Sequence, residues 1–253
     1  MNNHQTRIWQ IDIARGVAVI GMVIYHFLFD LEFIFRLPIG VSQIPLLLFA
    51  RTVATLFILL VGISATIKFQ KIKSKGIKKV VLSFGKKALR IFVYALIITG
   101  ATSIVFPKET IIFGVLHFIS LSLILLIPFL YLRSDVLIGV TGLLFISLGL
   151  LVSSITTTSP WLLFIGITQP SFSSFDYFPL LPWFGVVLLG LVLGRKYLQS
   201  TPDKNLTNRP YPKFGKILAN LGRHSLPIYL WHQPILWSTL LLIDKMITYY
   251  YTM

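Results

Sequence analysis

The sequence predicts an all-α, polytopic membrane protein, a bundle of about seven transmembrane helices that forms a single domain over residues 1–253. Hydrophobic residues make up 55% of the chain and charged residues only 12%, whereas a soluble domain has about 25% charged residues. The mean hydropathy is +0.81. Apolar stretches long enough to cross a membrane recur along the chain, and short polar segments separate them.

The first predicted helix, residues 11–35, carries four ionisable side chains inside an apolar frame. At about 100° per residue, they fall on one side of the helix. These residues are Asp12, Arg15, His26 and Asp30. His26 and Asp30 are four positions apart and are therefore neighbours on that side. Because a charged group in hydrocarbon costs at least roughly 2.5–3.5 kcal/mol, this polar stripe needs a partner or a function.

Four more helices are predicted before residue 153, over residues 45–67, 91–106, 111–132 and 136–152. Arg51 lies within the first of these and His117 within the third. Residues 68–90 contain nine Lys and Arg and no acid, and we predict that they form a basic linker. A basic linker of this kind most often lies against anionic lipid headgroups. It could also bind a substrate that carries an anionic nucleotide.

The remaining chain predicts two more helices, over residues 179–193 and 225–243. Residues 153–178 are rich in Ser, Thr and Pro and contain no segment long enough to span the bilayer. Gly190 and Gly194 have the spacing that allows close packing of helices. Residues 195–224 are predicted to form a second basic loop, and Pro227 and Pro234 are expected to break the last helix early.

The distribution of basic residues predicts a cytoplasmic N-terminus, and we expect the protein to lie in the plasma membrane. With seven spans, nineteen Lys and Arg lie inside and three lie outside. Asp12 and Arg15 then lie near the inner boundary, and His232 lies in the inner half. Several polar residues from separate helices converge in the outer half, namely His26, Asp30, Arg51, His117 and Asp176. The formal net charge of +15 is accounted for by this asymmetry and by anionic lipids, and we expect no nucleic-acid partner.

Each polar residue has a functional and a structural interpretation. His26 with Asp30 suits a base oriented by a carboxylate, or an activated nucleophile. Alternatively, Asp30 forms a buried ion pair with Arg51, and His26 bonds only to a carbonyl. Asp12 and Arg15 either bind a ligand or form a pair that satisfies itself at the start of the helix. His117 and His232 remain open between the two interpretations. The chain has no cysteine, and we expect no metal.

At this point the motifs resemble a known family. The stretch from Asp12, D-I-A-R-G-V-A-V-I-G-M-V-I-Y-H-F-L-F-D-L, is similar to the first-helix signature of the DUF1624 family, which is grouped with the catalytic domain of heparan-α-glucosaminide N-acetyltransferase. Other segments agree in order: R-T-V-A-T-L-F-I-L-L-V-G-I-S from Arg51, F-G-V-L-H-F from Phe113, D-Y-F-P-L-L-P-W-F-G from Asp176, and L-G-R-H-S-L-P-I-Y-L-W-H-Q-P-I from Leu221. The last segment also resembles the closing helix of the membrane acyltransferase-3 family.

The resemblance implies an acyltransferase that uses acetyl-coenzyme A from the cytoplasm. The acetyl group would pass through the bundle to an acceptor at the outer side, a sugar amine or hydroxyl. Lysosomal members of the family have Asn at the position of His26. The residues expected to hold coenzyme A are Asp12, Arg15, Arg90, Arg133 and Arg223.

We expect the chemistry at His26 and Asp30, supported by Arg51, His117, Asp176 and His232. His26 either deprotonates the acceptor or carries the acetyl group, while Asp30 fixes the imidazole tautomer and stabilises its cation. The rival interpretations are a transporter or proton-coupled carrier that uses the same polar track, and a membrane scaffold without activity. Homo-oligomerisation is left open.

Overall fold

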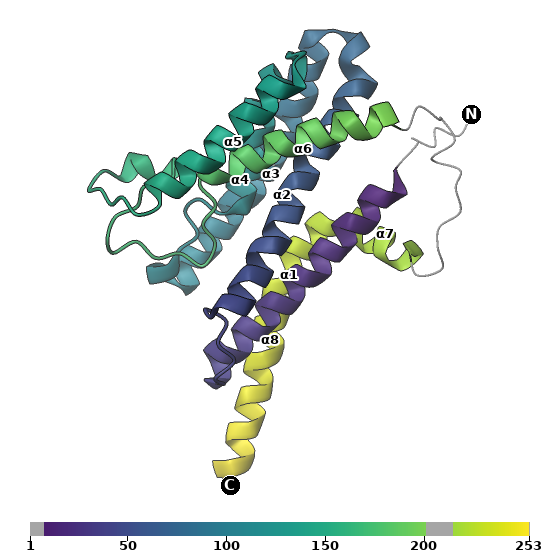
Figure 1. The fold of residues 1–253 in the computed structure, drawn as a ribbon. Helices are drawn as coiled ribbons and strands as arrows, with labels where there is room; N and C mark the ends of the chain where they lie inside the picture. Colours follow the sequence, from purple (N-terminus) through teal and green to yellow (C-terminus); the bar gives the residue numbers. More distant parts are fainter. Residues whose placement is uncertain (1–7, 201–214, 253) are drawn as a thin grey trace. The chain divides into compact units, whose positions relative to one another are not determined.

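The computed structural model describes residues 8–200 and 215–252, and in this part of the chain it contains helices and no strand. The all-α prediction is confirmed (Figure 1). Six described helices are long and apolar enough to cross a membrane, and a shorter apolar helix accompanies them. The longer ones are α1 (Trp9–Phe35), α2 (Ile44–Ile72), α3 (Ile77–Val105), α5 (Asp135–Val152), α6 (Leu180–Ser200) and α8 (Ser225–Thr252); the shorter apolar helix is α4 (Val115–Tyr131).

The chain divides into two compact units. The terminal unit comprises residues 1–57 and 203–253 and holds α1, the first half of α2, α8 and a nine-residue helix, α7 (Gly215–Arg223). The central unit comprises residues 58–202 and holds the second half of α2 together with α3 to α6. Each unit has side chains that are fully buried within it, such as Asp30 in the first and Phe84, Phe118 and Leu188 in the second.

In the terminal unit, α1 and α7 contact each other through one glycine on each helix. A Cβ atom at Gly16 would overlap the carbonyl of Leu218, and one at Gly222 would overlap the carbonyl of Asp12. The backbones can touch only because neither glycine has a side chain, which is the usual device for close packing of helices in membranes. This crossing holds the N-terminal end of α1 against α7.

In the central unit, α6 packs through glycines on two sides. Gly190 lies against the backbone of Leu59 in α2, and Gly194 lies against Ile63 of the same helix. This confirms the close packing predicted from the spacing of the two glycines. On another side, Gly185 lies against the carbonyl of Gly142 in α5. Many large apolar side chains on the outward faces of the helices are exposed, as expected for surfaces that contact lipid.

The prediction of a basic linker over residues 68–90 is wrong. Helix α2 continues to Ile72, a 3-10 turn follows as η1 (Lys73–Lys75), and α3 begins at Ile77. The chain is interrupted only around Gly76, whose φ of 85° is readily available to glycine alone. Lysine is a good helix former, so α2 and α3 run beyond their apolar segments into the basic residues.

The second basic loop and the last helix also differ from expectation. Helix α6 extends to Ser200, and α7 occupies residues 215–223, inside the segment predicted to be a loop. Residues 201–214 of that segment lie outside the described part of the chain. Helix α8 continues through Pro234 to Thr252, beyond its predicted end at residue 243. Residues 153–178 contain no spanning helix, as predicted; they hold a short 3-10 helix, η3 (Pro160–Phe164), and one isolated bridge between Thr156 and Thr168.

Candidate functional site

The terminal unit brings together two histidines that are more than two hundred positions apart in the sequence. The ring centroids of His26 on α1 and His232 on α8 are 4.8 Å apart, and the rings meet edge to face. His232 is 8% exposed, and Asp30, one turn beyond His26, is fully buried. The Nε2 of Gln233 donates a hydrogen bond of 3.2 Å to Oδ1 of Asp30. Trp237, one turn further along α8, also approaches this carboxylate.

We define the polar cluster as His26, Asp30, His232 and Gln233. Its two imidazoles are oriented in the same way. The Nδ1 of His26 lies 2.8 Å from the carbonyl of Met22, and the Nδ1 of His232 lies 2.7 Å from the carbonyl of Tyr229. A carbonyl oxygen only accepts, so each neutral ring carries its proton on Nδ1 and presents the lone pair on Nε2. Both histidines are therefore arranged as bases, or as nucleophiles, at Nε2.

In addition to Oδ2 of Asp30, two buried polar atoms of the cluster have no hydrogen-bond partner among the described residues. They are Nε2 of His232 and Oε1 of Gln233. Buried polar groups in folded proteins nearly always have a partner, and an orphaned one calls for an explanation such as a catalytic role or a bound molecule. Both atoms are acceptors, given the Nδ1 proton of His232. The cluster is therefore suited to a ligand that offers hydroxyl or amine protons.

The structure corrects two expectations about Asp30. Arg51 does not form an ion pair with it, because Arg51 is exposed on α2 while the buried carboxylate is bonded by the neutral amide of Gln233. Nor does Asp30 fix the tautomer of His26, since the carbonyl of Met22 does so through the backbone of α1 itself. The role that remains for Asp30 is electrostatic, because its carboxylate lies on the same helix as His26 and one turn away from it.

A second group of predicted residues also comes together in the terminal unit. Arg15 donates to Oδ1 of Asp12 at 2.9 Å, and Nε of Arg223 lies 3.9 Å from Oδ2 of the same carboxylate. The cause is the glycine crossing, because Gly222 touches the Asp12 backbone and so places the next residue, Arg223, beside it. The Asp12–Arg15 pair predicted as a structural possibility is formed. Two guanidinium groups around one carboxylate leave a net charge of +1.

The remaining predicted residues lie in the central unit. His117 is buried, with Nε2 3.5 Å from the hydroxyl of Thr99 and the ring of Phe92 at its edge. Asp176 accepts a 3.0 Å hydrogen bond from the backbone N–H of Val115, the first residue of α4. This is a helix cap supplied from a distant loop, so the structure gives Asp176 a structural role. Arg90 on α3 and Arg133 in the α4–α5 turn are both exposed.

The structure adds residues that the sequence did not single out. Arg195 on α6 donates to Asp135 at 2.8 Å and to the carbonyls of Phe129 and Leu130 at 3.1 and 3.0 Å. It thereby satisfies carbonyls that the end of α4 leaves without partners. In the loop before α6, the hydroxyl of Tyr177 donates to the carbonyl of Leu163 at 2.6 Å, and burial raises the pKa of Tyr177 to about 12. The sequence feature that could have identified Arg195 is its position as a basic residue near the end of an apolar helix.

Metal ligands do not gather in the described part of the chain, where no three His, Asp or Glu side chains are close enough to share an ion. The polar cluster offers proton-transfer and nucleophilic groups. Its chemistry at Nε2 is the kind used by general bases and by histidine nucleophiles.

Comparison with known proteins identifies the family. The model of the catalytic domain of heparan-alpha-glucosaminide N-acetyltransferase matches residues 7–234. This match includes His26, His232 and the whole of the central unit. No curated protein and no solved structure matched the chain. The chain is therefore a multi-pass membrane protein that belongs to the heparan-alpha-glucosaminide N-acetyltransferase catalytic-domain family.

Proposed function

We propose that the protein is a membrane-embedded acetyltransferase that moves an acetyl group from cytoplasmic acetyl-coenzyme A to a sugar amine or hydroxyl at the outer side of the plasma membrane. The observation that carries this proposal is the pair of facing imidazoles, each held with its lone pair at Nε2. Membership of an acetyltransferase family supports the reaction class. The donor, the acceptor and the direction across the membrane are parts of the proposal.

In the direct route, an Nε2 atom of the polar cluster accepts the proton of the acceptor hydroxyl or amine. The acceptor oxygen or nitrogen attacks the thioester carbonyl, the C–S bond breaks, and the thiolate leaves with the proton that the imidazolium returns. Acetyl-coenzyme A supplies the thioester. The negative charge of Asp30 stabilises the imidazolium while it holds the proton.

In the covalent route, Nε2 of His26 attacks the thioester itself. An N–C bond forms as the C–S bond breaks and coenzyme A leaves as a thiolate. The acetyl-imidazolium then passes its acetyl group to the acceptor, whose proton finally neutralises the thiolate. His232 takes the proton of the acceptor in this route, because its ring faces His26 at 4.8 Å. The two histidines thus divide the roles of nucleophile and base, whereas the direct route needs only one of them.

The proposed donor end is the Asp12, Arg15 and Arg223 group, with its net charge of +1. It lies at the opposite end of α1 from the polar cluster, and its α1 residues are 11 to 18 positions from His26 and Asp30 along the helix. At about 1.5 Å per residue, that separation is on the order of 20 Å, which a long, extended co-substrate arm can cover. Guanidinium groups suit the phosphates of coenzyme A. Anionic lipids are further partners proposed for the basic helix ends.

The test follows acetyl transfer with purified protein in detergent. Protein is incubated with radiolabelled acetyl-coenzyme A and a panel of amino sugars and sugars, and label is followed on acceptor and on precipitated protein. We expect His26→Ala to lower transfer by roughly 100- to 10,000-fold, the usual contribution of a general base. His224→Ala is the matched control, since His224 also bonds a carbonyl four residues earlier through Nδ1 but is exposed.

The same assay defines the result that would contradict the proposal. If the wild-type protein transfers no label and binds no coenzyme A, the acetyltransferase reading fails. Solute or proton flux in liposomes under the same conditions would instead support a carrier that uses the polar cluster as its path. Label that stays on the wild-type protein without an acceptor, and is absent from His26→Ala, selects the covalent route.

A further inference from the structure

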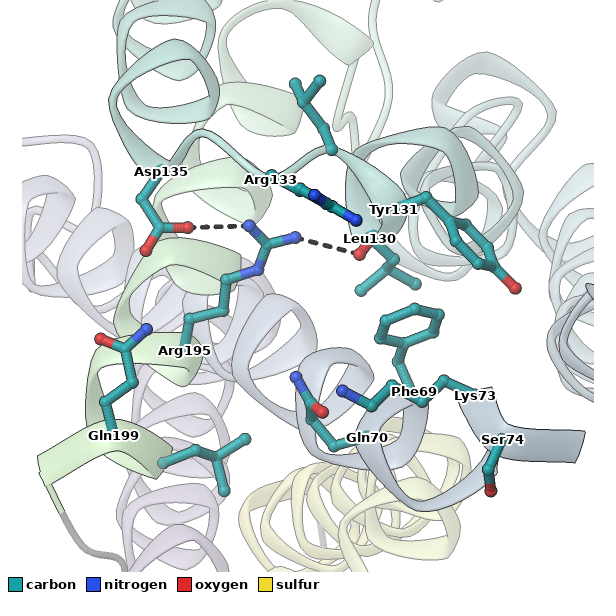
Figure 2. A pocket seen from close by; sticks show the side chains of 12 residues that line it. Phe69, Gln70, Lys73, Ser74, Leu130, Tyr131, Arg133, Asp135, Arg195 and Gln199 are labelled. Atoms are coloured by element: carbon teal, nitrogen blue, oxygen red, sulfur yellow. Dashed lines mark hydrogen bonds and ion pairs between the residues drawn. The ribbon is translucent and has the colours of Figure 1, made fainter. Parts of the chain in front are cut away.

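The central unit contains a pocket of about 820 Å³ that is remote in sequence from every residue of the polar cluster. Its walls come from helix ends: α2 and η1 on one side, the α4–α5 turn on the facing side, and the last turns of α6 beside them (Figure 2). Ligand pockets typically enclose about 300–1,000 Å³, so this volume suits a small organic molecule or a lipid headgroup.

The pocket is basic. Lys73, Arg133 and Arg195 line it, and Asp135 is its one acid. That acid is already bonded to Arg195, which is also held by carbonyls at the end of α4, so Arg195 forms a fixed part of the wall (Figure 2). Lys73 and Arg133 are exposed, and their side chains form no hydrogen bond or ion pair within residues 8–200 and 215–252. The pocket therefore has a net charge of +2, carried by two side chains that are free to turn toward a ligand.

We propose that this pocket is a phosphate-binding site in which Arg133 and Lys73 hold the phosphate of an anionic ligand. A guanidinium donates two parallel hydrogen bonds to phosphate oxygens, and an ammonium adds a compact charge with three donors. Ser74 and the amides of Gln70 and Gln199 lie on the same walls and can bond the remaining oxygens. The inference goes beyond the proposed function, because it holds whether or not the protein transfers an acetyl group.

The pocket also has an apolar wall, which suits a ligand with an apolar part beside its phosphate. The ring of Tyr131 meets that of Phe69 at 4.9 Å, and Leu130 and Leu198 continue this apolar wall. An aromatic and aliphatic wall beside two cations suits a base attached to a phosphate, or the glycerol and upper acyl chain of an anionic phospholipid. Both sources share the phosphate chemistry, so the experiment must separate them.

The experiment measures ligand binding to the full chain in nanodiscs. One arm titrates adenosine 3′,5′-bisphosphate into protein in neutral phosphatidylcholine nanodiscs. The other arm measures retention of phosphatidylglycerol by native mass spectrometry. The test variant is Lys73→Ala with Arg133→Ala. The matched control, Lys75→Ala with Lys196→Ala, removes the same charge from exposed residues of the same helix ends that do not line the pocket.

We expect the pocket variant to weaken one of the two ligands at least roughly tenfold and the control to change it less than about twofold. Ser74→Glu, which adds a negative charge to the wall without removing a donor of the cations, is expected to weaken the same ligand. The arm that responds identifies the source of the phosphate. Equal weakening in pocket variant and control, or no binding of either probe to the wild-type protein, overturns the proposal. Acetyl transfer and the His26→Ala effect are measured separately, so they fail or hold independently of this site.

Discussion

At Asp30, a substitution can remove the charge of the side chain without changing its packing. Asp30 is fully buried, and its Oδ1 accepts a hydrogen bond from Gln233. Asn at this position keeps an acceptor oxygen of the same size for Gln233 but removes the negative charge. We expect Asp30→Asn to fold with unchanged or slightly higher stability, because a buried charge is costly. We expect its acetyl-transfer rate to fall roughly ten- to hundredfold, because an imidazolium on α1 loses its stabilising anion.

The measurement is the rate of labelled acetyl transfer, together with thermal unfolding of both proteins in the same detergent. Asp30→Leu is the companion variant, since it also removes the acceptor for Gln233. We expect it to lower the free energy of unfolding by about 1–3 kcal/mol, the usual cost of leaving a buried donor unpaired. An Asp30→Asn protein that transfers acetyl at the wild-type rate would show that Asp30 only holds Gln233 in place.

At this scale, the sequence predicted which residues lie together on α1 better than it predicted their partners. Helical spacing correctly grouped His26 with Asp30, because spacing along one helix is local information. The pairing of Asp30 with Gln233 depends on the position of α8 beside α1, which spacing within one helix does not contain. The tautomer of His26 depends on a carbonyl of its own helix, and this bond competes with any carboxylate nearby. The catalytic roles proposed for His26 and Asp30 therefore remain hypotheses whose geometry is now specified.

Among the contacts between helices, the crossing of α1 and α7 is the one that a single substitution is expected to disturb most. A Cβ at Gly222 would overlap a backbone carbonyl of α1, and one at Gly16 would overlap a carbonyl of α7. A backbone atom cannot turn aside as a side chain can. We expect Gly222→Ala and Gly16→Ala each to destabilise the protein by roughly 1–3 kcal/mol, the usual cost of overpacking. Gly222→Ala should also weaken coenzyme A binding, because Arg223 moves away from Asp12.

The control for this prediction lies in α3. A Cβ at Gly85 or Gly100 meets no atom within 4 Å, and alanine is the better helix former by about 0.8–1.0 kcal/mol. We therefore expect Gly85→Ala and Gly100→Ala to leave the melting temperature unchanged or to raise it. The readout is the melting temperature by size-exclusion chromatography after heating. Equal melting temperatures for the α1–α7 variants and the α3 controls would contradict the backbone contact.

The sequence predicted the apolar helices well and the polar ones poorly. Hydrophobicity marks the part of a helix that lies in lipid, so the six long helices and α4 were each found near their observed positions. It does not mark where a helix continues into water, and for this reason the sequence predicts a linker over the basic residues 68–90, where the structure has helix. Helix α7 is short and polar on one face, and only its packing against α1 identifies it as an element of the site.

At the scale of the whole molecule, the family match runs through both compact units and ignores their boundary within α2. Basic residues gather at one set of helix ends in the central unit, around η1, the start of α3, the α4–α5 turn and the end of α6. The opposite loops, around residues 107–110 and 153–178, carry acids and a single lysine. Charge asymmetry of this kind predicts that the basic ends face the cytoplasm.

The absence of cysteine from the sequence makes this orientation directly testable. Ser74 in η1 and Ser171 in the loop before α6 are both exposed, and each is replaced by cysteine in turn. In intact cells, we expect a membrane-impermeant maleimide to label Ser171→Cys and to leave Ser74→Cys unlabelled, because the positive-inside rule puts η1 in the cytoplasm. After permeabilisation, both variants should be labelled, which controls for access to the thiol. Labelling of Ser74→Cys alone in intact cells would invert the topology, and with it the direction of acetyl transfer that the proposed function requires.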